Sequence, residues 1–156
     1  VKVATKRAGK ATTEGVVWSY IHAGNQVGVM VEVNCETDFV ARTDEFRKFA
    51  EEVAMQIAAM RPRWVAPEDV PEEVLERERS VLREQAESEG KPEHIVEKMV
   101  EGRLRKFYEE NCLLKQPYIR DDRLTIEDLL NELMAKTGEK IVIRRFVRYQ
   151  VGEELE

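Results

Sequence analysis

The sequence has few of the residues on which metal centres, disulfide frameworks and membrane spans depend. It contains only two cysteines, Cys35 and Cys112, and two histidines, His22 and His94, in 156 residues. The cysteines form no CxxC pair, and two histidines alone cannot complete a metal site. No apolar run approaches the roughly 20 residues of a membrane span, and no signal-peptide segment is evident. We therefore expect a protein of a reducing cytoplasm, with no metal, cofactor or membrane contact.

A catalytic constellation is equally hard to find. His22, Cys35 and Asp38 could in principle form a nucleophile and its base, but nothing supplies an oxyanion hole. His22 and Cys35 would also lie on different strands of a hairpin whose register the sequence does not fix. Gly9-Lys10 lacks the upstream glycine and the following Ser or Thr of a phosphate-binding loop. We expect that the chain is not an enzyme.

Charged residues are abundant, and their balance is acidic. They make up 36% of the chain, and the formal net charge is −6. Because phosphate contacts need a basic surface, direct nucleic-acid binding is not expected. Leu, Ile, Val and Phe remain common, so the charge does not imply disorder, and the length suits one domain with a real core.

Strand-like patterns occur in three runs. Residues 15–34 predict a β-hairpin, because two such runs flank the turn-forming sequence Ala23-Gly24-Asn25-Gln26. The valines of the second run share one face. Residues 140–151 predict a final strand, in which Ile141, Ile143, Val147, Tyr149 and Val151 alternate with Val142, Arg144, Phe146, Arg148 and Gln150.

Helical spacing is clearest over residues 44–60, where apolar residues recur at i, i+3, i+4 and i+7 and Thr43 is a suitable N-cap. Two further helical segments begin at Pro71 and Pro92. They are joined by the short Gly90-Lys91-Pro92 connection, which predicts an antiparallel helical hairpin.

A fourth helix is predicted after Thr125, which forms a capping pair with Asp128. Residues 113–124 are predicted to be a loop, and residues 1–14 a linker or helix end. The fold class is therefore α+β, with a three-stranded antiparallel sheet and helices on one side, in a core domain over residues 15–156.

The most informative stretch is residues 34–42, where the valine strand runs into the acidic-aromatic step Asp38-Phe39. A helix follows within a few residues, so this step lies at a strand-to-helix corner, where side chains tend to project. Spacing alone nevertheless favours a plain reading, because buried Phe is common. In that reading Asp38 caps a turn, and Phe39 and Val40 fill the core.

This stretch resembles the signature of bacterial translation elongation factor Ts. Thr37-Asp38-Phe39-Val40 matches that signature without a change, and ordered matches extend over nearly the whole chain. The other matching segments are residues 5–15, 19–22, 27–34, 90–92, 101–103, 113–117, 144–146 and 151–153. Several ordered matches are more specific than any one motif, and they favour a projecting Asp38-Phe39 step.

The resemblance implies a guanine-nucleotide exchange factor for the GTPase elongation factor Tu, bound in its GDP and nucleotide-free forms. In this family the Asp-Phe step intrudes near the Mg²⁺ and phosphate region of Tu, the ring wedges between elements of the GTPase, and GDP leaves. The resemblance makes Phe39 the wedge and Asp38 a charged lever, with Thr37 and Val40 as the supporting corner. Weaker contact candidates at the predicted hairpin tip are His22 and Gly24.

Two departures from the family pattern carry expectations of their own. Family members begin with a small helical module resembling a ubiquitin-associated domain, and this chain starts after it, so we expect a fragment with weaker Tu binding. Longer members have two related core subdomains where this chain has one, and a homodimer would restore the pair. The alternative function is a non-catalytic dimeric scaffold, which leaves the Asp38-Phe39 corner unexplained.

Overall fold

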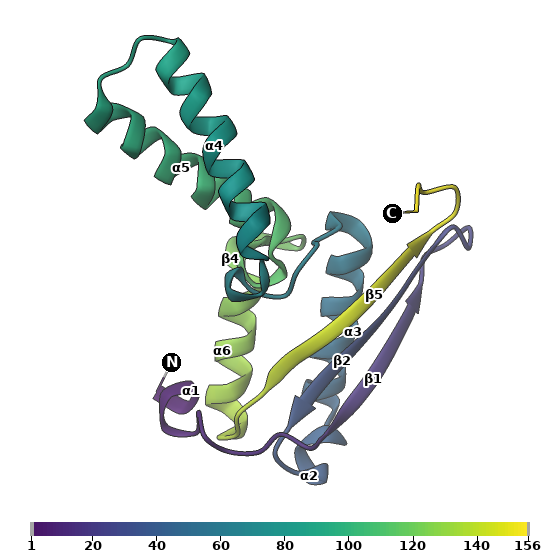
Figure 1. The fold of residues 1–156 in the computed structure, drawn as a ribbon. Coiled ribbons are helices and arrows are strands. Elements are labelled where there is room, and N and C mark those ends of the chain that lie inside the picture. Colours follow the sequence, from purple (N-terminus) through teal and green to yellow (C-terminus); the bar gives the residue numbers. More distant parts are fainter. Residues whose placement is uncertain (1, 156) are drawn as a thin grey trace. The chain divides into compact units, whose positions relative to one another are not determined.

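The computed structural model describes residues 2–155 and has the expected α+β fold (Figure 1). The described chain forms two compact units, each with its own buried core. The first unit contains the residues up to Arg61 and those from Pro117 onward, and the second is Pro62–Gln116. None of the described helices is both long and apolar enough to cross a membrane. The domain boundary before residue 15 stays a prediction.

A three-stranded antiparallel sheet forms one layer of the first unit (Figure 1). Strand β1 (Glu14–Ile21) pairs with β2 (Val27–Cys35), and β2 pairs on its other side with β5 (Val142–Gln150). The predicted hairpin and final strand are confirmed.

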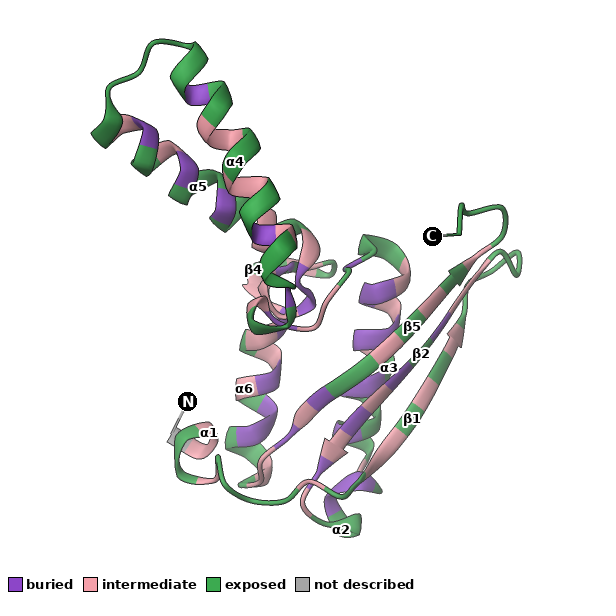
Figure 2. Ribbon diagram, viewed as in Figure 1, coloured by how far each residue is buried: buried purple, intermediate pink, exposed green. Residues whose placement is uncertain are grey.

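Helix α3 (Asp44–Met60) packs against β1 and β2 and buries one face of the sheet (Figure 2). The side chain of Thr43 accepts a hydrogen bond from the Phe46 backbone N–H at 3.2 Å, so the predicted N-cap is confirmed. The apolar stripe of this helix forms the core together with the β2 valines. The fully buried members are Val31, Val33, Phe46, Ala50, Val53, Ala54 and Ile57.

Strand β5 departs from simple alternation because of a β-bulge. Its register against β2 slips by one residue between Ile143 and Arg145. Before the slip Ile141 and Ile143 are buried, but beyond it Val147 and Tyr149 are exposed. The predicted alternation is therefore wrong beyond Ile143, because an extra residue in one strand turns all following side chains to the opposite face.

Helix α6 (Ile126–Thr137) leads into β5, and α1 (Lys2–Lys6) packs beside it. The capping box predicted at its start is confirmed, with the Thr125 hydroxyl accepting from the Asp128 N–H and the Asp128 carboxylate accepting from the Thr125 N–H.

The segment that was predicted to be a loop holds more structure than its sequence indicates. It contains the 3-10 turn η2 (Leu113–Lys115), in the second unit, and a small hairpin of β3 (Pro117–Tyr118) and β4 (Asp121–Thr125), in the first. The buried amide of Gln56 bonds to the hairpin backbone at 3.0 and 2.9 Å. Hydrogen bonds from a side chain that is distant in the sequence thus help to hold this segment in a hairpin.

The second unit is the antiparallel helical hairpin that the sequence predicts. The turn η1 (Pro67–Asp69) precedes α4 (Glu72–Ser88), which packs along α5 (Glu93–Asn111). Pro92 is the N-cap of α5, one position before the N1 site that its sequence favours. The core of this unit consists of Val70, Leu75, Ala86, Val96, Val100, Leu104 and Cys112.

Candidate functional site

The corner between β2 and α2 (Asp38–Ala41) presents a phenylalanine to solvent. The Phe39 side chain is 76% exposed, whereas Val40 and Ala41 are buried. Successive residues of a helical turn point about 100° apart, so burying Val40 and Ala41 turns Phe39 outward. The prediction from spacing that Phe39 fills the core is therefore wrong, and the same prediction for Val40 is confirmed.

Thr37, and not Asp38, caps the turn at this corner. Its backbone is extended, and its hydroxyl accepts a hydrogen bond from the Val40 N–H at 3.2 Å. Asp38 occupies the first position of α2 and forms an ion pair with Arg42, with 3.1 Å between Oδ2 and Nε. Both of these charged side chains are about two-thirds exposed, so the Asp38 carboxylate is free to meet another molecule.

Cys35 lies beneath the corner and supports it. Its side chain is fully buried, and its Sγ donates to the Thr37 carbonyl oxygen at 3.1 Å. Burial, assisted by the charge of Glu139, raises the pKa of the Cys35 thiol to about 11. A thiol that stays protonated at neutral pH is a poor nucleophile.

The hairpin register separates His22 from Cys35. Glu14 pairs with Cys35 at one end of the hairpin, and Ile21 pairs with Gly28 at the other. At about 3.3 Å per residue, the two ends lie roughly 20 Å apart. The nucleophile and base set that the sequence left open is therefore not assembled.

The residues of the hairpin tip are exposed to solvent. His22 shares a hydrogen bond with the Tyr20 hydroxyl, with 2.8 Å between Oη and Nδ1. Gly24 has a φ of +94°, which L-residues with a side chain rarely adopt, and a Cβ there would meet open space. If His22 and Gly24 contact the same partner as Phe39, that partner must extend along the whole hairpin.

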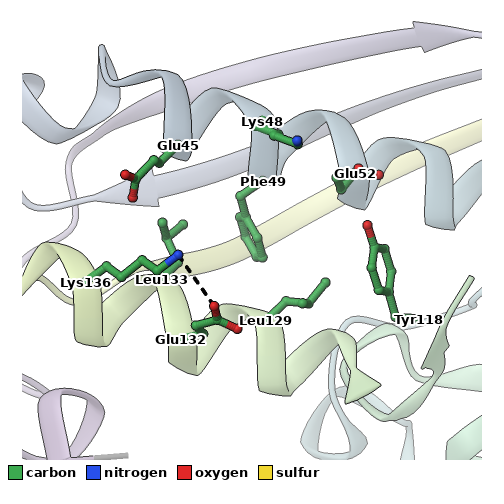
Figure 3. A pocket seen from close by; sticks show the side chains of 9 residues that line it. All are labelled: Glu45, Lys48, Phe49, Glu52, Tyr118, Leu129, Glu132, Leu133 and Lys136. Atoms are coloured by element: carbon green, nitrogen blue, oxygen red, sulfur yellow. Dashed lines mark ion pairs between the residues drawn. The ribbon is translucent and has the colours of Figure 1, made fainter. Parts of the chain in front are cut away.

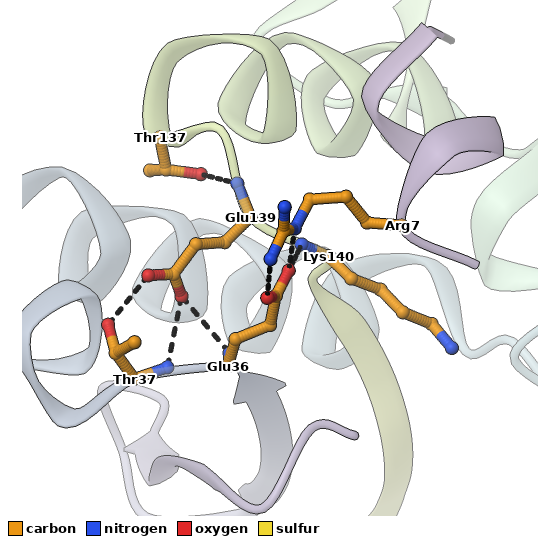
Figure 4. Close-up of polar contacts among 6 residues, drawn as sticks. All are labelled: Arg7, Glu36, Thr37, Thr137, Glu139 and Lys140. Carbon is orange, nitrogen blue, oxygen red and sulfur yellow. Dashed lines mark hydrogen bonds and ion pairs between the residues drawn. The ribbon is translucent and has the colours of Figure 1, made fainter. Parts of the chain in front are cut away.

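Three charged residues that the sequence analysis did not single out surround the corner (Figure 4). Arg7 donates to both carboxylate oxygens of Glu36, and the hydrogen bond from Arg7 is the main cause that lowers the pKa of Glu36 to about 2. Glu139, just before β5, directs its carboxylate at Glu36 and Thr37. These partners lie up to about a hundred residues apart in the chain, so no local pattern could have revealed them.

Figure 3 shows a hollow of the first unit that lies between α3 and α6. Phe49, Leu129 and Leu133 form its apolar floor, and exposed charged side chains of both signs surround it, including the ion pair of Lys136 with Glu132 at 3.5 Å. Among residues 2–155 no group of three His, Cys, Asp or Glu side chains is placed to hold a metal ion. The described side chains that line the hollow therefore include no metal-ligand set.

The sheet face opposite α3 exposes several large apolar side chains beside the ion pair of Arg145 with Glu32. Antiparallel pairing places Ser19, Met30 and Val147 in one row across the three strands, and Ile21, Gly28 and Tyr149 in another. The large apolar side chains of this outer face, each 45–71% exposed, are Val17, Ile21, Met30, Val147 and Tyr149. Large exposed apolar patches mark interaction sites in soluble proteins, so this face is a candidate for one.

Comparison with known proteins identifies the family. The family model described as Elongation factor TS matches residues 2–153. The chain belongs to the elongation factor Ts family. An elongation factor Ts of Moorella thermoacetica is 63% identical over 150 residues, which are 96% of this chain and 74% of the relative.

Two further elongation factor Ts relatives support the assignment. That of Caldanaerobacter subterraneus subsp. tengcongensis is 60% identical over 98% of this chain and 76% of its own, and that of Syntrophus aciditrophicus is 56% identical over 99% and 77%. The resemblance drawn from the Thr37–Val40 signature is therefore confirmed at the level of the family, over nearly the full chain.

Proposed function

We propose that this member of the elongation factor Ts family promotes GDP release from the GTPase elongation factor Tu. The observation that carries the proposal is the 76% exposure of the Phe39 side chain. It lies on a corner whose backbone is hydrogen-bonded by the side chains of Cys35, Glu139 and Thr37. Phe39 would enter Tu near its Mg²⁺ and phosphate site and displace the elements that grip the nucleotide. Thr37 and Val40 would hold the corner from below and would not themselves touch Tu extensively.

The energetics of one ring limit what Phe39 can do alone. Burying a Phe side chain is worth roughly 1.5–3 kcal/mol. If all of it weakened GDP binding, the gain would be about ten- to a hundredfold. A preformed corner helps, because little ordering free energy is lost when the ring docks. Stronger acceleration would need a broad contact, for which the helical hairpin and the hairpin tip with His22 and Gly24 are the candidates.

Asp38 would supply charge at the same place. Among the described residues it forms an ion pair with Arg42, and exposed pairs of this kind are worth about 1 kcal/mol or less. Exchanging that partner for a group on Tu therefore costs little. A carboxylate brought to a Mg²⁺-phosphate site would repel the negative charge of the phosphates. Its oxygens would also compete with the phosphates for the Mg²⁺ ion, because Mg²⁺ takes oxygen ligands.

The proposed action is a coupling between two binding equilibria and needs no bond chemistry by this chain. If the chain weakens GDP binding, GDP must weaken binding of the chain by the same factor. The first test is therefore co-elution of the chain with nucleotide-free Tu, followed by addition of GDP. A complex that forms and then separates supports exchange, and a complex indifferent to GDP supports the scaffold alternative. We propose that this takes place in the cytoplasm, without contact to nucleic acid or membrane.

We also propose that a second copy of the chain covers the outer face of the sheet. Both outer strands have unpaired edges within the described sheet, and the outer strand β5 carries the exposed side chains of Val147 and Tyr149 on this face. The two cysteines are free and buried, so the dimer we propose has no intersubunit disulfide. Val147→Asp would place an unpaired carboxylate in the interface and should shift the chain to a monomer in sedimentation equilibrium. A wild-type chain that is monomeric at high concentration would contradict the dimer.

A further inference from the structure

The loop between α6 and β5 lies against the Phe39 corner and bonds to it through one carboxylate (Figure 4). Glu139 Oε1 accepts hydrogen bonds from the backbone N–H groups of Glu36 at 3.1 Å and Thr37 at 3.0 Å. Glu139 Oε2 accepts from the Thr37 hydroxyl at 2.6 Å. A single side chain thus satisfies two backbone donors and one hydroxyl of the residues that lead into α2.

The Thr37 hydroxyl passes this constraint on to α2. A hydroxyl has one proton to donate and two lone pairs that accept. Because Thr37 gives its proton to Glu139, a lone pair stays directed at the Val40 N–H, which it meets at 3.2 Å. Glu139 therefore fixes the rotamer of the residue that caps the turn carrying Phe39.

The contact is reciprocal: residues 36 and 37 and residues 139 and 140 each bind the backbone of the other segment through a glutamate side chain. While Glu139 binds the backbone of residues 36 and 37, the Glu36 carboxylate accepts from the Lys140 backbone N–H. The Arg7 guanidinium donates to both oxygens of the same carboxylate, and the Lys140 ammonium donates to the Ala8 carbonyl. Hydrogen bonds from the loop before β5 and from the segment after α1 therefore support the corner.

The turn needs this bracing because it is very short. Helix α2 has four residues, and a single helical turn is not stable on its own in water. The sheet and α3, by contrast, have their own buried core of valines, Phe46 and Ile57. Loss of Glu139 should therefore loosen α2 well before it unfolds the first unit.

We propose that Glu139 is a positioning residue for nucleotide exchange, which holds Thr37 and α2 so that Phe39 is presented in one orientation. The inference rests on the proposed exchange function. A loosened turn would present Phe39 correctly for only a fraction of the time, and the rate of GDP release at saturating chain would fall to that fraction of the wild-type rate. We expect a loss of about tenfold for Glu139→Ala.

The conservative variant and a matched control separate positioning from general damage. Glu139→Gln keeps an acceptor oxygen for the two N–H groups and a donor for Thr37, and should retain most of the exchange rate. Glu132→Ala removes an exposed carboxylate of α6, which among residues 2–155 forms an ion pair with Lys136, and should have no effect. Equal losses for Glu139→Ala and Glu139→Gln, or a loss for Glu132→Ala, would count against positioning.

The rate of GDP release by a double variant distinguishes a positioning role of Glu139 from a merely structural one. If Glu139 acts through Phe39, Glu139→Ala combined with Phe39→Ala should release GDP no more slowly than Phe39→Ala alone. If Glu139 only stabilises the fold, the two losses should multiply. Multiplying losses, or a Glu139→Ala rate equal to that of the wild type, would overturn the inference while leaving the proposed function intact.

A measurement on the chain without Tu tests the positioning role of Glu139 separately from the proposed exchange function. Amide hydrogen exchange by NMR should be at least tenfold faster at Glu36, Thr37 and Val40 in Glu139→Ala, and unchanged at Val31 in the sheet. Unchanged protection at the three corner amides would overturn the inference. If the corner loosens as expected but the wild-type chain fails to release GDP from Tu, the proposed function fails, and the exchange role of Glu139 fails with it.

Discussion

Phe39 and Phe46 lie close together in the sequence, at the start of two successive helices, yet their environments are opposite. Phe39 in α2 is 76% exposed, and Phe46 in α3 is completely buried. Phe46 belongs to a long apolar stripe that packs on the sheet, whereas Phe39 belongs to a single turn that buries only Val40 and Ala41. The buried ring of Phe46 stabilises the fold. The ring of Phe39 remains in solvent, where its apolar surface contributes little to stability.

The largest effect that should separate the two residues is on stability. Phe46→Ala would leave a cavity under the sheet and should lower the free energy of unfolding by about 3–5 kcal/mol. In a chain of this size the melting temperature should fall by about 10 °C. Phe39→Ala should change the free energy of unfolding by less than about 0.5 kcal/mol. Thermal and urea unfolding of both variants check this, and similar losses would mean that Phe39 packs into the core.

The next largest effect concerns the cap that supports Phe39. Thr37→Val keeps the shape of the side chain and removes its hydroxyl, so the Val40 N–H and Glu139 each lose a partner. We expect about 1 kcal/mol of lost stability, typical of an N-cap, and about tenfold slower GDP release from Tu. Thr37→Ser keeps the hydroxyl and serves as the control. A Thr37→Val variant as active as Thr37→Ser would show that the cap is not needed.

A smaller effect should appear only in acid. The pKa of Glu36 is lowered from 4.5 to about 2, chiefly by its hydrogen bond from Arg7. A lowered pKa in the folded state means that Glu36 stabilises the fold fully above about pH 4.5 and progressively less as the pH falls toward 2. Urea midpoints between pH 5 and 2 should therefore fall more steeply for the wild type than for Glu36→Gln. Parallel profiles would contradict the pairing of Arg7 with Glu36.

The smallest effect is expected at the hairpin tip. His22 is exposed, and its side-chain hydrogen bond is to Tyr20 two residues away. Even if the tip contacts Tu, His22→Ala should slow GDP release only about twofold, equivalent to about 0.4 kcal/mol. Stopped-flow release with this variant measures the effect. A loss as large as that of Phe39→Ala would move the main contact from the corner to the tip.

Periodic patterns predicted most of the fold, because burial of a regular face leaves a regular trace. The valines of β2, the stripe of α3 and the capping box at Thr125 each follow from local spacing, and each is confirmed. The bulge in β5 could not be predicted, since Arg144 and Arg145 carry no sign of which one is the extra residue. The β3–β4 hairpin depends on the distant Gln56 side chain, which a local pattern does not reveal.

The candidate site was predicted in part. The signature at Thr37–Val40 indicated the corner, but spacing alone favoured a buried Phe39, because one helical turn is too short to show which side faces the core. The brace formed by Arg7, Glu36 and Glu139 joins three segments far apart in the chain. Such long-range polar contacts have no sequence periodicity, and only the structure shows them.

The most direct test of the central claim is stopped-flow release of fluorescent GDP from elongation factor Tu by this chain and its Phe39→Ala variant. Leu155→Ala, which removes another exposed apolar side chain at the opposite end of the chain, is the matched control. We expect fast release by the wild type and by Leu155→Ala, and at least tenfold slower release by Phe39→Ala at unchanged stability. Release by Phe39→Ala as fast as that by the wild type would contradict the claim that the exposed ring at this corner drives exchange.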